Sequence, residues 1–177
     1  MAAPAGVPHR WVPVRAPQHG LLCARLPPGA PLRASLCEAA AASGGGGAWV
    51  VTCVGSLRSA RLRLAGASAG GGSDDEEEHR FLDVVGPAEV CGLVGTFAAD
   101  GRCHLHATLA DERGRVVGGH LVGDDLVHTT CEVVLGIARG DAAFSREHDE
   151  LTGYDELVVS PADGAPSGPQ RWWWPFS

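Results

Sequence analysis

The chain has 177 residues, 45% hydrophobic and 20% charged, which suits one globular domain and excludes a chain too polar to form a core. The net charge is −7 and every basic residue is an arginine, so no lysine-rich patch is present to hold nucleic-acid phosphates. No apolar run approaches the roughly 20 residues of a membrane span, and the start lacks the apolar core of a signal peptide. We therefore expect a cytoplasmic protein, with a nuclear location as the alternative, and neither membrane nor nucleic acid as a partner.

The first 47 residues predict a flexible arm, one strand and one helix. Residues 1–19 are rich in proline and alanine and show no period, which is typical of a loose arm. The run LLCARL at 21–26 is typical of a strand. Pro31 suits the first turn of a helix, and apolar side chains follow at helical spacing until the glycines at 44–47 end it.

Two pairs of strands and an acidic loop follow in the sequence. The β-branched run at 49–54 and the leucine-arginine segment at 56–66 predict two strands separated by a glycine. Residues 81–85 and 90–97 predict two more strands, on either side of a Gly-Pro pair. Between these pairs, residues 66–79 combine glycine and serine with the acidic run DDEEE, which indicates a solvated, disordered loop.

Residues 103–122, CHLHATLADERGRVVGGHLV, contain three of the eight histidines and predict a β-hairpin. The sequence ERG at 112–114 fits a three-residue loop that ends in a glycine of left-handed conformation. That loop sets His106 opposite His120 and leaves His104 one pleat along the same face. The alternative is a two-residue turn at Arg113 and Gly114. It would shift the register by one residue and move His120 to the other face.

The last part of the chain predicts one long strand, a polar segment and a tail. The strand covers 127–138 and carries Glu132 in an apolar setting, and the polar segment FSREHDELTGYDEL follows it. Residues 161–177 are expected to form a flexible tail with a tryptophan-rich end. The elements together predict an α+β fold with a mostly antiparallel sheet, in one domain at 20–160.

Six segments of the chain match one family: RLPPGAPLRASL, VGSLRSARLR, GLVGTF, HLHATLADERGRVVGGHL, EVVLG and FSREHDELTGYDEL. Through them the chain resembles the plants and prokaryotes conserved (PPC) domain from about Leu21 to Val159, and the histidines around the hairpin are the specific feature. The resemblance implies a seven-stranded antiparallel sheet with flanking helices, assembled as a homotrimer. Plant members also carry an Arg-Gly-Arg-Pro hook for DNA. Here the Arg-Gly-Arg sequence lies within the hairpin and no proline follows it, so that minor-groove anchor is missing.

The chain is also similar to the wider fold group of acetolactate decarboxylase, in which a His-x-His strand and a further histidine hold zinc. That similarity implies that His104, His106 and His120 are the zinc ligands. Three imidazoles on one sheet face would leave a fourth position for water or substrate, as in catalytic zinc sites. The alternative is that the three histidines form a hydrogen-bonded polar layer or a trimer contact.

Glu132 is the candidate catalytic residue, as a general base or as a hydrogen-bond partner of a ligand. The alternative for Glu132 is an ion pair with an arginine such as Arg146. The six cysteines form no CxxC pair, so the sequence predicts neither a cysteine-based zinc site nor a disulfide framework.

The first expectation for function is a homotrimeric PPC-type protein that binds zinc and whose activity the sequence does not reveal. One alternative is a zinc-dependent lyase or hydrolase that acts on a small carbonyl or carboxylate compound. The other is a DNA-associated or protein-interaction scaffold like the plant members.

Overall fold

The computed structural model of the chain describes residues 12–15, 20–65, 80–139 and 142–161. These residues form nine strands and one helix. The elements are, in chain order, β1 Val12–Arg15, β2 Gly20–Leu26, α1 Leu32–Ala42, β3 Gly47–Arg63, β4 Phe81–Ala98, β5 Cys103–Asp111, β6 Val116–Gly123, β7 Val127–Ala138, β8 Ala142–Asp149 and β9 Tyr154–Pro161. The predicted α+β fold, mostly antiparallel, is confirmed. The expectation of several flanking helices is wrong for the described residues, which contain α1 alone.

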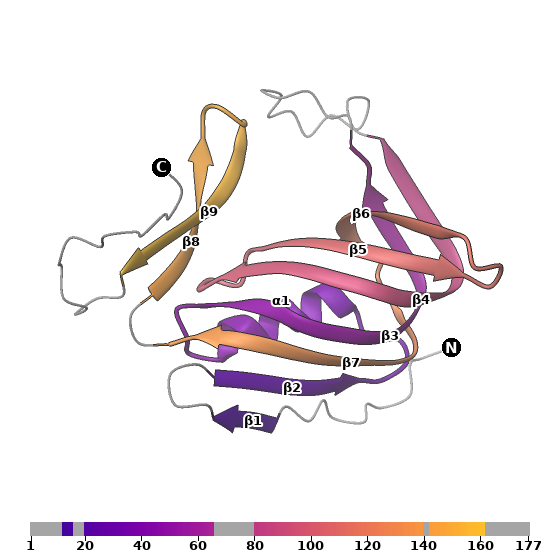
Figure 1. Ribbon diagram of the computed structural model, residues 1–177, viewed down its shortest axis with the longest axis horizontal. Coiled ribbons are helices and arrows are strands. Elements are labelled where there is room, and N and C mark those ends of the chain that lie inside the picture. Colours follow the sequence, from indigo (N-terminus) through magenta and orange to yellow (C-terminus); the bar gives the residue numbers. More distant parts are fainter. Residues whose placement is uncertain (1–11, 16–19, 66–79, 140–141, 162–177) are drawn as a thin grey trace, which may run out of the picture.

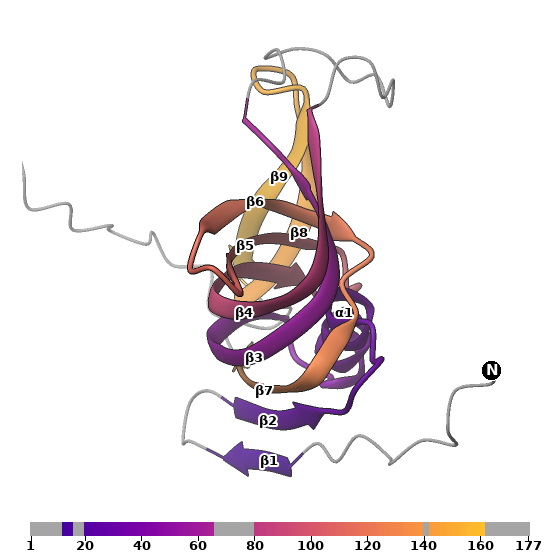
Figure 2. The ribbon, with the colours of Figure 1, turned by 90° about the vertical axis from the view of Figure 1, so that its right-hand side faces the viewer.

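The main sheet has the strand order β1-β2-β7-β3-β4-β5-β6, and β8 and β9 pair separately as a hairpin (Figure 1). All of the pairings are antiparallel. Figure 2 shows α1 against one face of the sheet, here called the inner face. The opposite, outer face is turned towards the viewer in Figure 1. The two faces have different chemistry because side chains alternate between them along every strand.

The core lies between α1 and the inner face. Leu32 and Leu36, one helical turn apart, are fully buried, and so are Leu105, Leu109 and Leu121 from β5 and β6. The apolar side of the 103–122 hairpin thus packs on the core. The consequence is that the polar side chains of the same two strands must lie on the outer face.

The first turn of α1 is held by the turn between β6 and β7. Asp125 accepts hydrogen bonds from two backbone amides, that of Leu32 through its carbonyl at 2.8 Å and that of Arg33 through its carboxylate at 2.7 Å. Free amides at a helix start need such acceptors, and Pro31, which precedes the helix, offers no side-chain cap. Burial raises the pKa of the Asp125 carboxyl. A turn far away in the sequence therefore anchors the helix to the sheet.

Each of β3 and β4 is one long strand where the sequence predicted two. At Gly55 the pairing with β7 shifts register without ending, and φ of 151° with the backbone of Thr130 close by leaves no room for a side chain. In β4, Gly86 and Pro87 lie unpaired between two residues that still pair with β3. Extra residues of this kind form β-bulges, which bend a strand without interrupting the sheet. The predicted breaks at the glycine and at the Gly-Pro pair are therefore wrong.

Part of the predicted N-terminal arm is ordered strand. Val12–Arg15 pairs antiparallel with β2 and forms one edge of the sheet. The rest of the 1–19 arm, the acidic segment 66–79 and the chain from 162 onward lie outside the described residues. The helix in the described part of the chain is too short to cross a bilayer.

The loop between β5 and β6 has the predicted three-residue form. The amide of Asp111 donates to the carbonyl of Arg115, and the amide of Gly114, with φ of 73°, donates to the carbonyl of Asp111, each at 2.9 Å. The Asp111 carboxylate accepts hydrogen bonds from the amides of Arg113 and Arg115 and pairs with the Arg115 guanidinium at 2.6 Å. These bonds hold the pKa of Asp111 below its usual range. The predicted register, with His106 opposite His120, is confirmed.

We expect Asp111→Asn to lower the thermal midpoint of unfolding at neutral pH. The difference in midpoint between the variant and the wild type should become smaller as the pH falls below about 4. The folded protein depresses the pKa of this carboxyl, so its contribution to stability is present above the unfolded value and is lost as the pH falls through the folded value. Asparagine can still accept from the loop amides but cannot pair with Arg115. Melting curves across this pH range test the expectation, with the exposed Glu112→Gln as control. An unchanged midpoint at pH 7 would contradict it.

Candidate metal centre

Three histidines meet on the outer face of the β5–β6 hairpin. His104 and His106 stand two residues apart on β5, and His120 on β6 is the cross-strand partner of His106. The adjacent Leu105 and Leu121 are 1% and 0% exposed on the inner face. The alternation that buries these leucines therefore turns the three imidazoles outward.

The imidazoles are close enough to share one ion. The Nε2 atoms of His104 and His106 are 3.0 Å apart, and one potential ligand nitrogen from each of the three rings lies within 4.8 Å of the other two. A tetrahedral zinc ion with bonds of about 2.0–2.1 Å holds its nitrogens roughly 3.4 Å apart. Small rotations of the rings would give that spacing. In the described residues this is the group of histidine, cysteine and acidic side chains that meets the distances of a metal site.

Two of the three imidazoles are kept neutral by their surroundings. Burial, followed by the charge of Arg63, lowers the pKa of His120 to about 3. Burial also lowers the pKa of His104, with smaller contributions from His106 and Arg146. Neutral imidazole is the form that binds metals. The Nδ1 atom of His120 is buried and has no hydrogen-bond partner in the described residues, and this unsatisfied nitrogen fits a cation-binding cluster.

Cationic and phenolic groups surround the cluster. The buried Arg146 of β8 donates a hydrogen bond to Thr96 Oγ1 at 2.6 Å, and Thr96 on β4 is the cross-strand partner of His104. On the other side, the guanidinium of Arg63 lies 5.4 Å from the ring centroid of Tyr154. The sequence does not predict Arg63 or Tyr154 as part of the site, and it indicates Arg146 only as an alternative partner of Glu132. No local sequence pattern connects Arg146 and Tyr154 with the histidines, because they lie on the β8–β9 hairpin outside the main sheet.

A pocket of about 510 Å³ opens beside the cluster. Its walls come from the ends of β3 and β9 and from the β5–β6 hairpin. The residues that bear on its chemistry are Arg63, His106, Thr108, Gly118, His120 and Tyr154. A small molecule in this pocket would contact two of the three imidazoles directly.

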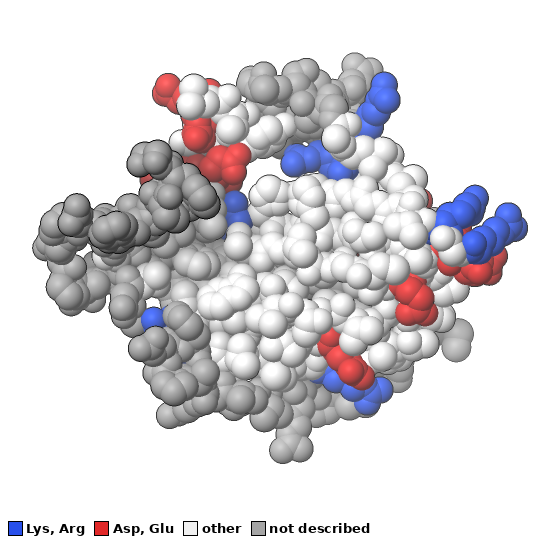
Figure 3. All heavy atoms as spheres, viewed as in Figure 1, with Lys and Arg blue, Asp and Glu red and all other residues white. Residues whose placement is uncertain are grey.

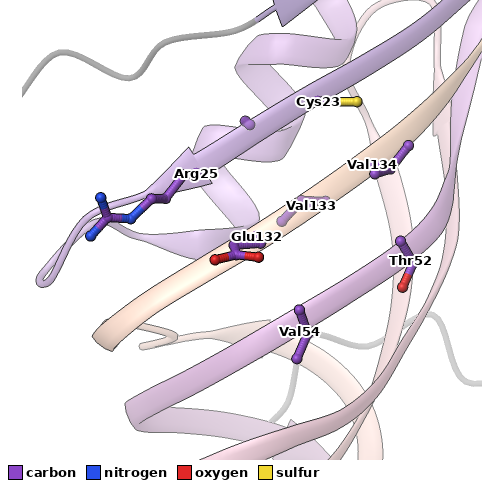
Figure 4. A pocket seen from close by; sticks show the side chains of 8 residues that line it. Cys23, Arg25, Thr52, Val54, Glu132, Val133 and Val134 are labelled. Carbon is purple, nitrogen blue, oxygen red and sulfur yellow. The ribbon is translucent and has the colours of Figure 1, made fainter.

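Glu132 does not belong to this centre. It lies on β7, which is separated from β5 by β3 and β4, so three strand spacings of about 4.8 Å put it roughly 14 Å away. Glu132 lines a different pocket, of about 390 Å³, together with Thr52 and Val54 (Figure 4), and its cross-strand partners are Arg25 on β2 and Val54 on β3. The alternative pairing with Arg146 is not formed either, because that guanidinium contacts Thr96.

Cys103 points away from the imidazoles, as the strand alternation predicts. Its thiol shares a hydrogen bond with the thiol of Cys37 on α1, and this bond is the largest cause that lowers the pKa of Cys103 to about 7. All six cysteines are free thiols.

The model of one protein family matches most of the described chain. The family is the Plants and Prokaryotes Conserved (PCC) domain, matched over residues 17–139, and it is the family that the sequence motifs indicated. A curated relative, the bifunctional protein GlmU of Synechococcus sp. (strain JA-2-3B'a(2-13)), is 38% identical over 121 residues, which cover 68% of this chain and 17% of that protein. The chain thus spans less than a fifth of the length of the curated relatives it matches.

Solved structures share the fold. A hypothetical protein of Salmonella cholerae-suis superposes with a TM-score of 0.70 at 31% identity, over 83% of this chain and 97% of that one. A metal-containing protein of Archaeoglobus fulgidus gives 0.63 at 24% identity, over 85% and 97%. A protein of Bacteroides thetaiotaomicron, named provisionally as DNA-binding, gives 0.63 at 12% identity, over 84% and 96%. The last two similarities establish the fold alone.

Proposed function

Because the chain belongs to the Plants and Prokaryotes Conserved (PCC) domain family, we propose that it is a homotrimeric protein that binds one zinc ion per chain through His104, His106 and His120. The observation that carries this proposal is the convergence of three imidazole nitrogens within 4.8 Å on one rigid hairpin. Imidazole ligands suit zinc among the common divalent metals. The metal-containing protein of Archaeoglobus fulgidus, which shares the fold, gives further support.

A zinc-dependent lyase or hydrolase is the second candidate, and the adjacent pocket favours it. Three protein ligands leave a position for substrate or water, and zinc bound there would polarise a carbonyl or lower the pKa of a water to about 7. The pocket of about 510 Å³ is large enough for a small carbonyl or carboxylate compound. Tyr154 contributes a phenol to it. Glu132 lies too far from the histidines to be the base of such a reaction.

The homotrimer is supported by the chemistry of the outer face. Val54 and Val94 lie on that face with exposed fractions of 57% and 63%. Figure 3 shows that charged groups are sparse across the same side of the molecule. Exposed apolar surface of this kind marks a protein interface. Copies of this chain are the partner that we propose for it.

The DNA-associated scaffold has less support. Its basis is the plant members of the family and the provisional name of one structure of the same fold. The formal net charge of −7 opposes it, since DNA binding depends on basic surface.

Native mass and metal content of the purified protein test the proposal together. Three chains of 18.3 kDa give a particle of about 55 kDa, and light scattering should report that mass at micromolar concentration. Elemental analysis should find about one zinc per chain. A monomer would refute the assembly. A trimer that takes up no divalent metal would refute the metal centre and leave the interaction scaffold.

A further inference from the structure

Three buried polar atoms without a hydrogen-bond partner in the described residues all border the histidine cluster. They are Nδ1 of His120, Nε of Arg146 and the phenolic oxygen of Tyr154. Buried polar atoms in folded proteins are almost always paired, so each exception calls for an explanation. Two of the three atoms, those of His120 and Tyr154, belong to residues that line the adjacent pocket, which points to a polar ligand there.

Two arginines beside the cluster indicate that this ligand is an anion. Arg146 is only 7% exposed, and its side chain donates to the uncharged hydroxyl of Thr96. Arg63 is the cross-strand partner of His120 and lines the pocket. Within the described residues, no carboxylate lies at ion-pair distance from either guanidinium. Buried and half-buried arginines are normally paired with an anion. The Glu156 carboxylate also acts on His104, but one carboxylate against two guanidiniums leaves the site with positive charge to spare.

The pocket wall leaves space for a small molecule between these groups. Gly118 stands on the same face as His120, two residues before it and opposite Thr108, and it puts no side chain into the pocket. Leu64 and Ala65 add apolar surface next to Arg63. A charged end beside apolar surface suits an organic acid with a short carbon chain better than an inorganic ion.

We propose that this pocket binds a small carboxylate, with its anionic group against Arg63 and Tyr154 and its other end towards the three histidines. The planar guanidinium can donate two parallel hydrogen bonds to a carboxylate, and the phenol can donate a third. Arg146, on the far side of His104, adds to the positive field of the site. The orientation towards the histidines rests on the proposed metal function, whereas the contacts of Arg63 and Tyr154 do not.

Titration calorimetry with succinate tests the proposal on the full-length protein, both zinc-loaded and metal-free. We expect the wild type to bind succinate at millimolar or lower concentration and Arg63→Gln to bind it about tenfold or more weakly, the loss typical of a charge-assisted hydrogen-bonded pair. Tyr154→Phe should weaken binding less. Arg58→Gln, at an exposed position of the same strand, is the matched control and should bind like the wild type.

The outcomes separate the pocket from the metal centre. Equal affinity of the wild type and Arg63→Gln, or no succinate binding by either form of the wild type, would overturn the proposal. Tighter binding of inorganic phosphate than of succinate would overturn the assignment to carboxylates. Zinc content is measured on the same samples. If the protein takes up no zinc on loading and still binds succinate through Arg63, the pocket is supported and the metal centre is refuted, whereas zinc uptake without succinate binding refutes the pocket alone.

Discussion

His106→Ala and His120→Ala should each reduce bound zinc from about one per chain to a small fraction, whereas His128→Ala should retain it. The first two variants remove one of three ligands that lie within 4.8 Å of one another. Zinc sites in proteins need at least three protein ligands to hold the ion firmly. His128 is exposed on β7, which is separated from β5 by β3 and β4 in the sheet order. Elemental analysis after exhaustive dialysis gives the ratio.

Folding of the variants must be checked in parallel. The imidazoles lie on the outer face, and the buried leucines of the hairpin are untouched, so the circular dichroism spectrum should stay that of the wild type. If both variants retain full zinc, the three histidines are a polar layer and the metal proposal is wrong. A wild type that never takes up metal would lead to the same conclusion.

Phe97→Ala should cost about 3–5 kcal/mol of unfolding free energy, a large share of the roughly 5–15 kcal/mol of a typical domain. Phe97 is fully buried and is among the largest of the buried side chains. It lies near the end of β4, paired with Ala48 on β3 and Cys103 on β5. Its removal leaves a cavity in the core beside Cys103, the residue before His104 on β5.

Urea unfolding measures this cost, at one protein concentration because the stability of an oligomer depends on concentration. Val85→Ala is the control on the same strand. Val85 is 89% exposed, and its truncation should change stability by no more than about 0.5 kcal/mol. A loss below about 1 kcal/mol for Phe97→Ala would mean that this part of the core is loosely packed.

The metal ligands could be predicted because their geometry depends on local rules. A three-residue loop with Gly114 in the left-handed region sets the hairpin register, and period-2 alternation then decides which face each histidine takes. Helix α1 was predictable for a similar reason, since Pro31 and the spacing of Leu32 and Leu36 lie within a few residues of one another.

The remaining site residues depend on contacts that no local pattern encodes. Arg63 reaches the site because the end of β3 also pairs with β6, and Tyr154 arrives on a hairpin about 90 residues further along. Glu132 shows the converse. A lone carboxylate in an apolar strand indicates an exposed position on a sheet, but its distance to the histidines depends on the order of the strands. Because β7 pairs with β2 and β3, Glu132 lies away from the histidine cluster.

The short loop between β5 and β6 also limits which changes in sequence the hairpin can tolerate during evolution. The side chains of the loop residues Glu112 and Arg113 point to solvent, so their identity can change at little cost. The length of the loop cannot change in the same way. One added or deleted residue would exchange the faces of His120 and Leu121, which would bury an imidazole and expose a leucine. Descendants of this chain should therefore vary freely in the composition of that loop while conserving its number of residues.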